Sequence, residues 1–157
     1  MPRLETLLPY VKKEKGEVRP LIVVDSREAT TASKVIEDLM QLGAEVSVKP
    51  LQMGDYVISE ECAFERKTVR DFIFTLTRRD LFEQLLFLRE AYPKPFIIIE
   101  GYLPMIYKFS KIKPSSVWGA MFALGKQGVN LIHTTNHKET ADFLYTSARQ
   151  EQIVEKR

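Results

Sequence analysis

The sequence predicts an α/β fold in which a mixed β-sheet is flanked by helices on both faces. Two β-branched runs, at residues 21–25 and 96–99, are typical of buried strands. Segments with apolar residues three and four positions apart lie between such runs, and this is the spacing of amphipathic helices. Strands that alternate with helices, with one hairpin among them, favour a sheet covered on both faces. The 157 residues suit one domain, and no shift in composition divides them.

In order, the first half of the chain is expected to form a strand, a helix, a strand, a hairpin and a helix. These elements fall at residues 21–25, 30–43, 46–48, 56–66 and 68–76. Thr30 or Thr31 caps the first helix and Gly43 ends it, because threonine suits a helix start and glycine a helix end. Thr68 begins the second helix.

The second half is expected to form a helix, a strand, a helix, a strand and a closing helix. These elements fall at residues 80–88, 96–99, 114–122, 129–132 and 136–148. Asp80 with Glu83, and Asn136 with Glu139, have the three-residue spacing of a capping box. Pro114 sits at the start of its helix, where proline is favoured.

The composition indicates a globular protein of a reducing compartment. Hydrophobic residues make up 45% and charged residues 28%, proportions that exclude collagen-like, disordered and disulfide-framework chains. The single cysteine, Cys62, cannot form an internal disulfide. The start lacks a continuous apolar segment and no apolar run approaches the ~20 residues of a membrane span. We therefore expect an intracellular location, the cytoplasm or nucleoid of a prokaryote or the nucleus of a eukaryote. The net charge of +2 neither requires nor excludes a polyanionic partner.

The hairpin brings acidic residues together. If its loop is residues 59–61, the pairing puts Asp55 directly across from Glu65, with Cβ atoms roughly 5 Å apart. A two-residue loop would instead put Asp55 opposite Arg66. Because side chains alternate along a strand, Glu65 and Lys67 share one face and Arg66 points to the other.

Two facing carboxylates repel each other unless they share a proton or hold a cation. Asp25, at the end of its strand, is placed to supply a third acid. Oxygen ligands alone favour Mg²⁺ or Mn²⁺ over zinc. With Lys67 directed at the attacking water or at a phosphate oxygen, these parts suit metal-assisted hydrolysis of a phosphodiester. A surface charge cluster is the competing interpretation, and Asp71 with Thr68 also fits a capping box.

These residues resemble the signature of the XPF/Hef family of structure-selective DNA endonucleases. Gly54-Asp55, Glu65-Arg66-Lys67 and Asp71 look like its GD-x(n)-ERK-x(3)-D motif. Residues 24–28 (VDSRE) resemble its strand-end acid with the following Arg-Glu, and residues 81–84 (LFEQ) its LF-D/E-Q helix start. The likeness covers about residues 21–150.

The resemblance implies a restriction-endonuclease-like core that nicks one strand of flap, fork or branched DNA near the junction, in DNA repair or replication-fork processing. The metal ligands that it implies, for Mg²⁺ or Mn²⁺, are Asp25, Asp55 and Glu65. It makes Lys67 the residue that positions the attacking water. Arg66 and Asp71 complete the candidate catalytic set, with a supporting role in phosphate contact or site geometry.

Basic residues near the motif are the candidate DNA contacts. They are Arg27, Arg70, Arg78 and Arg79. Arg27 and Glu28 are expected at the rim of the site. The family usually has arginine immediately before the LF pair, whereas this chain has Asp80, so Arg78 or Arg79 would substitute from one step earlier. A solvated helix face is the plain alternative for this basic run.

The resemblance also implies partners and a domain plan. Late helices form a dimer interface in the family, which makes residues 114–126 and 137–150 candidates for a homodimer contact, against plain core packing. A sliding clamp, a helicase or a partner bearing a helix-hairpin-helix module would deliver the domain to DNA. We expect an N-terminal arm at 1–19, the nuclease domain at 20–150 and a C-terminal tail at 151–157.

Two other functions compete with an active endonuclease. One is a catalytically silent subunit that recognises DNA structure and pairs with an active partner. Such subunits tend to lose the acids or the lysine of the motif, and all of them are present here. The other is a small-molecule α/β protein, which would leave the pairing of acids unexplained and for which the sequence offers no glycine-rich phosphate loop.

Overall fold

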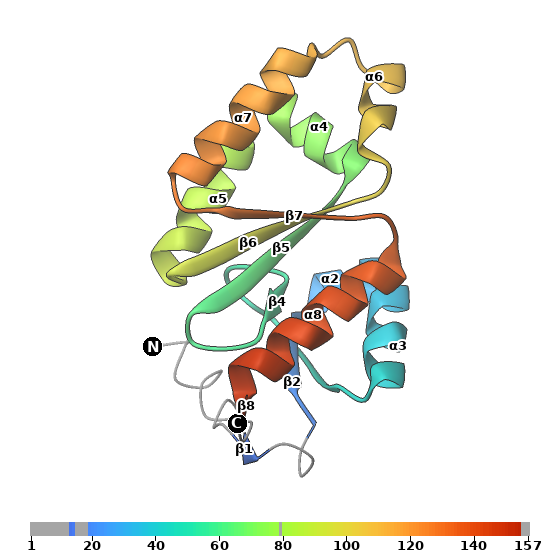
Figure 1. The fold of residues 1–157 in the computed structure, drawn as a ribbon, viewed down its shortest axis with the longest axis vertical. Coiled ribbons are helices and arrows are strands. Elements are labelled where there is room, and N and C mark those ends of the chain that lie inside the picture. Colours follow the sequence, from blue (N-terminus) through green and yellow to red (C-terminus); the bar gives the residue numbers. More distant parts are fainter. Residues whose placement is uncertain (1–12, 15–18, 79, 155–157) are drawn as a thin grey trace.

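A six-stranded mixed sheet forms the centre of the protein (Figure 1). The computed structural model describes residues 13–14, 19–78 and 80–154. The strand order is β3-β2-β4-β5-β6-β7. The strands are β2 (Leu21–Asp25), β3 (Glu45–Lys49), β4 (Tyr56–Val57), β5 (Cys62–Thr68), β6 (Lys94–Glu100) and β7 (Asn130–Thr134). Neighbours run parallel except at β4, which is antiparallel to both β2 and β5. The mixed sheet that the sequence predicts is confirmed.

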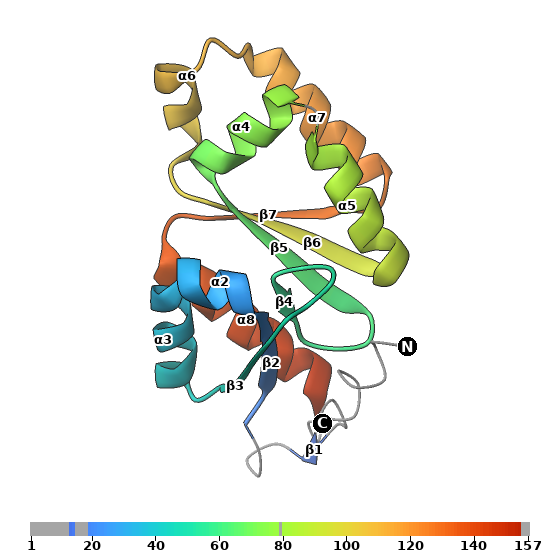
Figure 2. The same cartoon turned by 180° about the vertical axis from the view of Figure 1, so that it is seen from behind.

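Helices cover both faces of this sheet, as Figures 1 and 2 show from opposite sides. One face packs against α2 (Ser26–Thr31), α3 (Ser33–Leu42) and α8 (His137–Gln152). The other face packs against α4 (Val69–Arg78), α5 (Asp80–Ala91) and α7 (Pro114–Lys126). A short 3₁₀ turn (Leu103–Met105) and α6 (Ile106–Phe109) lead from β6 to α7.

The two sides of the sheet have separate hydrophobic cores, and the alternation of strand side chains divides them. Ala63 and Ile97 are buried in the core under α4, α5 and α7. Their neighbours Phe64 and Ile98 are buried in the core under α3 and α8. On β5, odd-numbered side chains therefore face α4, and even-numbered side chains face α8.

Most of the expected helix ends are present. Gly43 ends α3 with a left-handed φ of +104°, and the Asp71 amide donates a hydrogen bond to Thr68 Oγ1 (3.2 Å) at the start of α4. Asn136 caps α8 by accepting a hydrogen bond from the Glu139 amide (2.9 Å).

The expected cap at Thr30 or Thr31 is wrong. A helix already begins at Ser26, directly after β2, and the two threonines lie in its last turn. Their hydroxyl groups donate to the carbonyl oxygens of Ser26 (3.2 Å) and Arg27 (2.8 Å), four residues back. Since these hydroxyls find acceptors within their own helix, they do not cap the next one. The second helix, α3, starts after Ala32 instead, without a side-chain cap.

The first and last strands that the structure describes pair with each other. β1 (Lys13–Glu14) pairs in parallel with β8 (Ile153–Val154), so part of the expected arm lies beside part of the expected tail. The rest of the arm and the end of the tail, residues 1–12, 15–18 and 155–157, lie outside the described residues. Among the helices that the structure describes, none has the length and apolar character needed to cross a membrane.

Candidate active site

The hairpin of β4 and β5 has the register that the sequence predicts. Tyr56 pairs with Phe64 and Val57 with Ala63, which fixes a loop at residues 59–61. The Asp55 amide donates to the Phe64 carbonyl oxygen (2.8 Å), one residue out of this register, so the regular pairing ends at Tyr56. Asp55 and Glu65 nevertheless lie close enough for the Asp55 charge to act on Glu65, and whether the two acids face each other directly stays a prediction.

Backbone geometry fixes Asp55. The preceding residue, Gly54, has φ +83°, a left-handed conformation that side chains other than glycine rarely adopt. One oxygen of the Asp55 carboxylate accepts a hydrogen bond from the Arg66 amide (2.8 Å) on β5. The Asp55 carbonyl oxygen accepts from the Asp25 amide (2.9 Å) at the end of β2. Asp55 therefore joins the two strands that carry the other candidate acids.

Asp25 lies beside this pair, and both of its carboxylate oxygens have partners. Oδ1 accepts a hydrogen bond from the Leu51 amide (2.8 Å), and Oδ2 accepts one from Arg27 Nε (3.1 Å). The Asp25 side chain is almost fully buried, whereas Arg27 is exposed at the rim, where the sequence places it. Asp25 is thus held at the edge of the site by one backbone and one side-chain donor.

Glu65 and Lys67 occupy odd positions of β5, on the face toward α4. Burial, together with the Asp55 charge, raises the pKa of Glu65 to about 8, although the Lys67 ammonium opposes both effects. Burial also raises the pKa of Asp55, and the Asp25 charge adds to this rise. The Arg66 amide and the Lys67 charge act in the opposite direction. Both carboxyl groups therefore keep their protons to a higher pH than an exposed acid does.

This concentration of carboxylate oxygens suits a hard divalent cation. Such an ion relieves the repulsion between Asp55 and Glu65, and both offer the oxygen ligands that it prefers. In the part of the chain that the structure describes, however, no three Asp, Glu, His or Cys side chains are already arranged to hold a metal ion. Each Asp25 oxygen accepts one hydrogen bond, from Leu51 or Arg27, and keeps a second lone pair for a cation. The three-acid metal site thus stays a prediction.

Arg66 lies away from this group. Its even position sends the side chain to the α8 face, where it is 10% exposed. Its Nε lies 3.3 Å from Glu28 Oε2 and 3.5 Å from Glu100 Oε1, and neither carboxylate is aligned to accept a hydrogen bond from it. Of the two supporting roles that the motif implies, this burial favours site geometry over phosphate contact.

A buried polar network surrounds Arg66, and the sequence does not reveal it. Glu28, expected at the rim, is buried and accepts a hydrogen bond from the Tyr56 hydroxyl (2.6 Å). Glu100 accepts one from the Thr140 hydroxyl (2.6 Å) on α8. The alternation of side chains along a strand is the one signal in the sequence that could have found this network. Tyr56, Arg66 and Glu100 occupy even-numbered strand positions and point to the same face of the sheet.

The remaining candidates lie on α4. Asp71 is exposed in its first turn, next to β5, and its amide makes half of the predicted capping box. Arg70 and Arg78 are also exposed on α4. Arg79 lies outside the described residues.

The sheet, with its acids beside a strand-end aspartate, defines a nuclease domain of the restriction-endonuclease-like type, and solved structures of XPF share this fold. The XPF from Aeropyrum pernix in complex with DNA matches with a TM-score of 0.78 and 38% identity, over 84% of this chain and 64% of that one. A second structure of that protein gives a TM-score of 0.73 at 36% identity. The chain belongs to the ERCC4 domain family, whose domain matches residues 24–147, and within it to the XPF-type nuclease domains.

Two archaeal relatives are longer than this chain. The 3′-flap repair endonuclease Xpf of Saccharolobus solfataricus is 32% identical over 135 residues, 85% of this chain and 57% of the relative. A protein of Methanocaldococcus jannaschii named as an ATP-dependent RNA helicase is 37% identical over 137 residues, 87% of this chain and 16% of the relative. The chain therefore spans less than two thirds of each of these relatives.

Proposed function

We propose that this chain is a metal-dependent, structure-selective endonuclease that nicks one strand of flap, fork or branched DNA near the junction. The observation that carries the proposal is the mutual influence of Asp55, Glu65 and Lys67, with Glu65 and Lys67 on the same face of β5. Membership of the ERCC4 family supports it, as does the name of the archaeal 3′-flap endonuclease among its relatives.

Each candidate residue has a separate role in the proposed hydrolysis. Asp55 and Glu65 would hold Mg²⁺ or Mn²⁺, with Asp25 as the third ligand, and the bound ion would polarise the scissile phosphate. Both carboxyl groups must lose their protons first, because carboxylates bind metals in the ionised form. The Lys67 ammonium orients the attacking water or a phosphate oxygen. Arg66 holds β5 in place from the opposite face through Glu28 and Glu100.

Cleavage of a 3′-flap DNA, with linear duplex as the comparison, tests this function. We expect the wild-type chain to nick the flap substrate with Mg²⁺ or Mn²⁺ and to be inactive in EDTA. Asp55→Ala and Lys67→Ala should each lower the rate roughly 100-fold or more, because each removes a group at the reacting phosphate. Asp142→Asn, at an exposed acid on α8, is the matched control and should cut like wild type.

Two results would contradict the proposal. Equal cutting by all four proteins would show that a contaminant cleaves the DNA. Flap binding without cutting under either metal would favour the silent, structure-recognising subunit.

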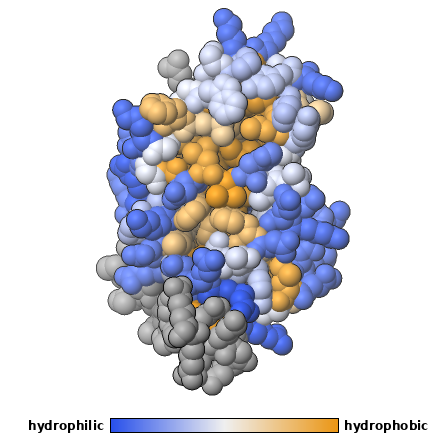
Figure 3. All heavy atoms as spheres, viewed as in Figure 1, coloured by the Kyte–Doolittle hydropathy of each residue, from blue (hydrophilic) through white to orange (hydrophobic). Residues whose placement is uncertain are grey.

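We also propose a homodimer, and its contact lies on α7. Trp118 and Phe122 on this helix are 64% and 71% exposed, and apolar residues gather over α7 and β7 on the face that Figure 3 shows. An apolar groove of about 740 Å³, lined by Phe82, Ile112 and Gly119 among others, adjoins the helix. By contrast, Ala141, Leu144 and Ala148 of α8 are buried in the core. Of the two predicted interface segments, 114–126 presents the apolar surface.

Sedimentation equilibrium at micromolar concentration checks the dimer. Wild type should sediment as a dimer and the double variant Trp118→Ala/Phe122→Ala as a monomer. Phe87→Ala removes a comparably exposed aromatic ring from α5 and should stay dimeric. A monomeric wild type would exclude this contact. The full-length relatives leave room for a helicase, a helix-hairpin-helix module or a sliding clamp as further partners.

A further inference from the structure

Helix α4 carries a basic and aromatic surface that neither the core nor the acid pair uses. Arg70, Phe74 and Arg78 form this surface, hereafter the α4 face. Phe74 is 55% exposed, although α4 already buries Val69, Phe72 and Ile73 in the core. The Arg78 guanidinium lies over the Phe74 ring, 4.4 Å from its centroid. The α4 face therefore presents one aromatic ring with a cation stacked on it.

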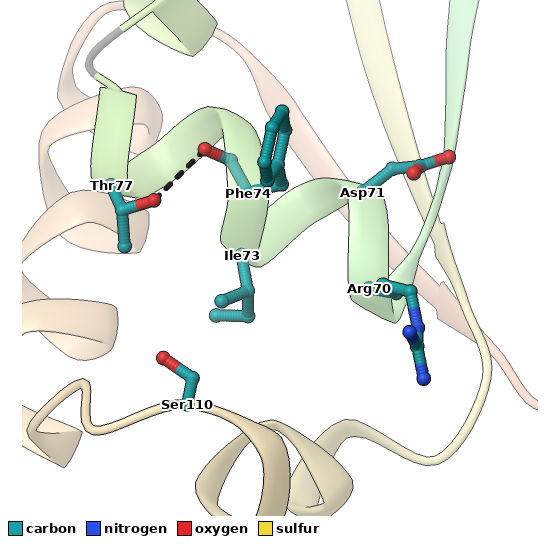
Figure 4. Close-up of a pocket in the computed structure, with 6 residues that line it drawn as sticks. All are labelled: Arg70, Asp71, Ile73, Phe74, Thr77 and Ser110. Carbon is teal, nitrogen blue, oxygen red and sulfur yellow. Dashed lines mark hydrogen bonds between the residues drawn. The ribbon is translucent and has the colours of Figure 1, made fainter.

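A hollow of about 530 Å³ adjoins the α4 face (Figure 4). Its lining residues are Arg70, Asp71, Ile73, Phe74, Thr77 and Ser110. In Figure 4, Ile73 and Thr77 extend from α4 toward Ser110, while Phe74 stands on another side of the helix, next to Asp71. The surface thus combines an open space and two hydroxyl groups with an exposed ring, one face of which lies under Arg78.

The charge around this hollow favours a polyanion. Lys108, Lys111 and Lys113 lie within three residues of Ser110 along the chain, and residues 101–126 contain no Asp or Glu. Arg70 and Arg78 add positive charge from α4, and Asp71 is the single acid in the lining. Positive charge beside an aromatic ring is the combination that binds single-stranded nucleic acid without regard to sequence.

The α4 face also lies next to the acid pair along the chain. Helix α4 follows directly after β5, which carries Glu65 and Lys67, and the Asp71 side chain is directed toward β5 in Figure 4. With ten residues, α4 extends about 15 Å away from this point. A strand lying along it would pass from the candidate site across Arg70, Phe74 and Arg78.

We propose that the α4 face binds the unpaired strand of a branched DNA, with a base stacked on Phe74 and phosphates against Arg70 and Arg78. A single strand is favoured over duplex because duplex bases are already stacked on each other and leave no free face for the ring. The place of this strand within a branched substrate rests on the proposed endonuclease function. Binding of a free single strand does not depend on that function.

Fluorescence anisotropy with a labelled oligothymidylate of about 12 nucleotides tests the inference on the full chain, in EDTA so that no cutting occurs. Phe74→Ala should weaken binding roughly tenfold, through the loss of one stacked base. Phe74→Trp should retain binding. Phe87→Ala, the matched ring on α5, should bind like wild type. Arg78→Ala should weaken binding and reduce the slope of log affinity against log salt by ~0.7, the amount for one phosphate contact to a single strand.

Three results would overturn the inference. They are equal affinities of Phe74→Ala and Phe87→Ala, wild-type affinity in Phe74→Leu, and conversion of the dimer to monomer by Phe74→Ala with DNA affinity unchanged. Wild-type affinity in Phe74→Leu would show that stacking on the ring is not involved. Loss of the dimer without loss of DNA affinity would make the α4 face a contact between two copies of this chain. If the chain does not cleave DNA, the binding experiment still tests the α4 face. If the Phe74 variants bind like wild type, the cleavage experiment still tests the endonuclease function.

Discussion

Gly54 illustrates how a single residue sets the position of a proposed metal ligand, Asp55. Its positive φ, and the 3.3 Å that would separate an added Cβ from Leu88 Cδ1, both oppose any side chain there. Gly54→Ala is expected to lower the free energy of unfolding by about 1–2 kcal/mol, measured by urea unfolding, and to abolish flap cleavage by displacing Asp55.

Gly128 provides a matched control for this substitution. It has a similar φ of +85°, but no atom lies within 4 Å of an added Cβ. Gly128→Ala should therefore lose stability through backbone strain and keep cleavage. Equal cleavage by the two alanine variants would show that Asp55 does not depend on the turn at Gly54.

Glu28 gives the protein a pH-dependent stability. Burial, with the Asp55 charge, raises its pKa to about 7 from the usual 4.5, in spite of the Arg66 charge and the Tyr56 hydrogen bond. Between pH 4.5 and 7 the folded protein thus keeps a proton that the unfolded chain has released. The free energy of unfolding must therefore fall as the pH rises through this window.

Urea unfolding at pH 5 and pH 8 in EDTA, on wild type and Glu28→Gln, measures the effect. The decrease from the lower to the higher pH should be smaller in Glu28→Gln, which carries no titrating proton at this position. Glu37→Gln, at an exposed position of α3, should show the wild-type decrease. An identical decrease in all three proteins would exclude Glu28 as a source.

At the scale of elements, local sequence patterns predicted the β4–β5 hairpin but did not predict α2, the helix that follows β2. The hairpin register depends on strand alternation and a short polar loop, and both can be read along the chain. Helix α2 has the sequence SREATT, which lacks apolar periodicity. It follows directly from the end of β2, so its existence depends on where the sheet ends.

Part of the candidate site was predictable from the sequence and part was not. Asp55, Glu65 and Lys67 belong to one hairpin, so spacing alone brings them together. Glu28, Arg66 and Glu100 come from three elements that only tertiary packing joins. The sequence of α7 also does not tell whether its apolar residues pack in the core or in an interface, because both uses require the same helical spacing.

The cap at the start of α8 is expected to contribute to the stability of the protein. Asn136 Oδ1 accepts from the Glu139 amide, and Glu139 Oε1 accepts from the Thr135 amide (2.7 Å). Asn136→Ala should lower the free energy of unfolding by about 1 kcal/mol, because it leaves a donor of the first turn without its cap. Asn136→Asp keeps an acceptor and should stay close to wild type in thermal unfolding. A stability loss in the aspartate variant equal to that in the alanine variant would argue against a capping role.

At the scale of the whole molecule, Gln152 fastens the last helix to the sheet. Its side-chain amide exchanges two hydrogen bonds of 2.6 Å with the Leu21 backbone and donates a third to the Ile58 carbonyl oxygen (2.7 Å). All of these groups are buried. One glutamine thus satisfies the first residue of β2 and the end of β4 together.

Gln152→Ala leaves these three backbone groups without partners. Since each buried unpaired group costs about 1–3 kcal/mol, the free energy of unfolding should fall by at least about 2 kcal/mol in chemical denaturation. Gln41→Ala, exposed on α3, should change it little. A Gln152→Ala protein as stable as the Gln41→Ala protein would mean that water replaces the amide.

The pairing of β1 with β8 determines how neighbouring modules can be attached. Lys13 and Ile153 are register partners, and Gln152 contacts Leu21, whereas Asp25 terminates β2 at its other end. Any module joined before β1 or after β8 is therefore attached at this end of the sheet, at the opposite end of β2 from Asp25.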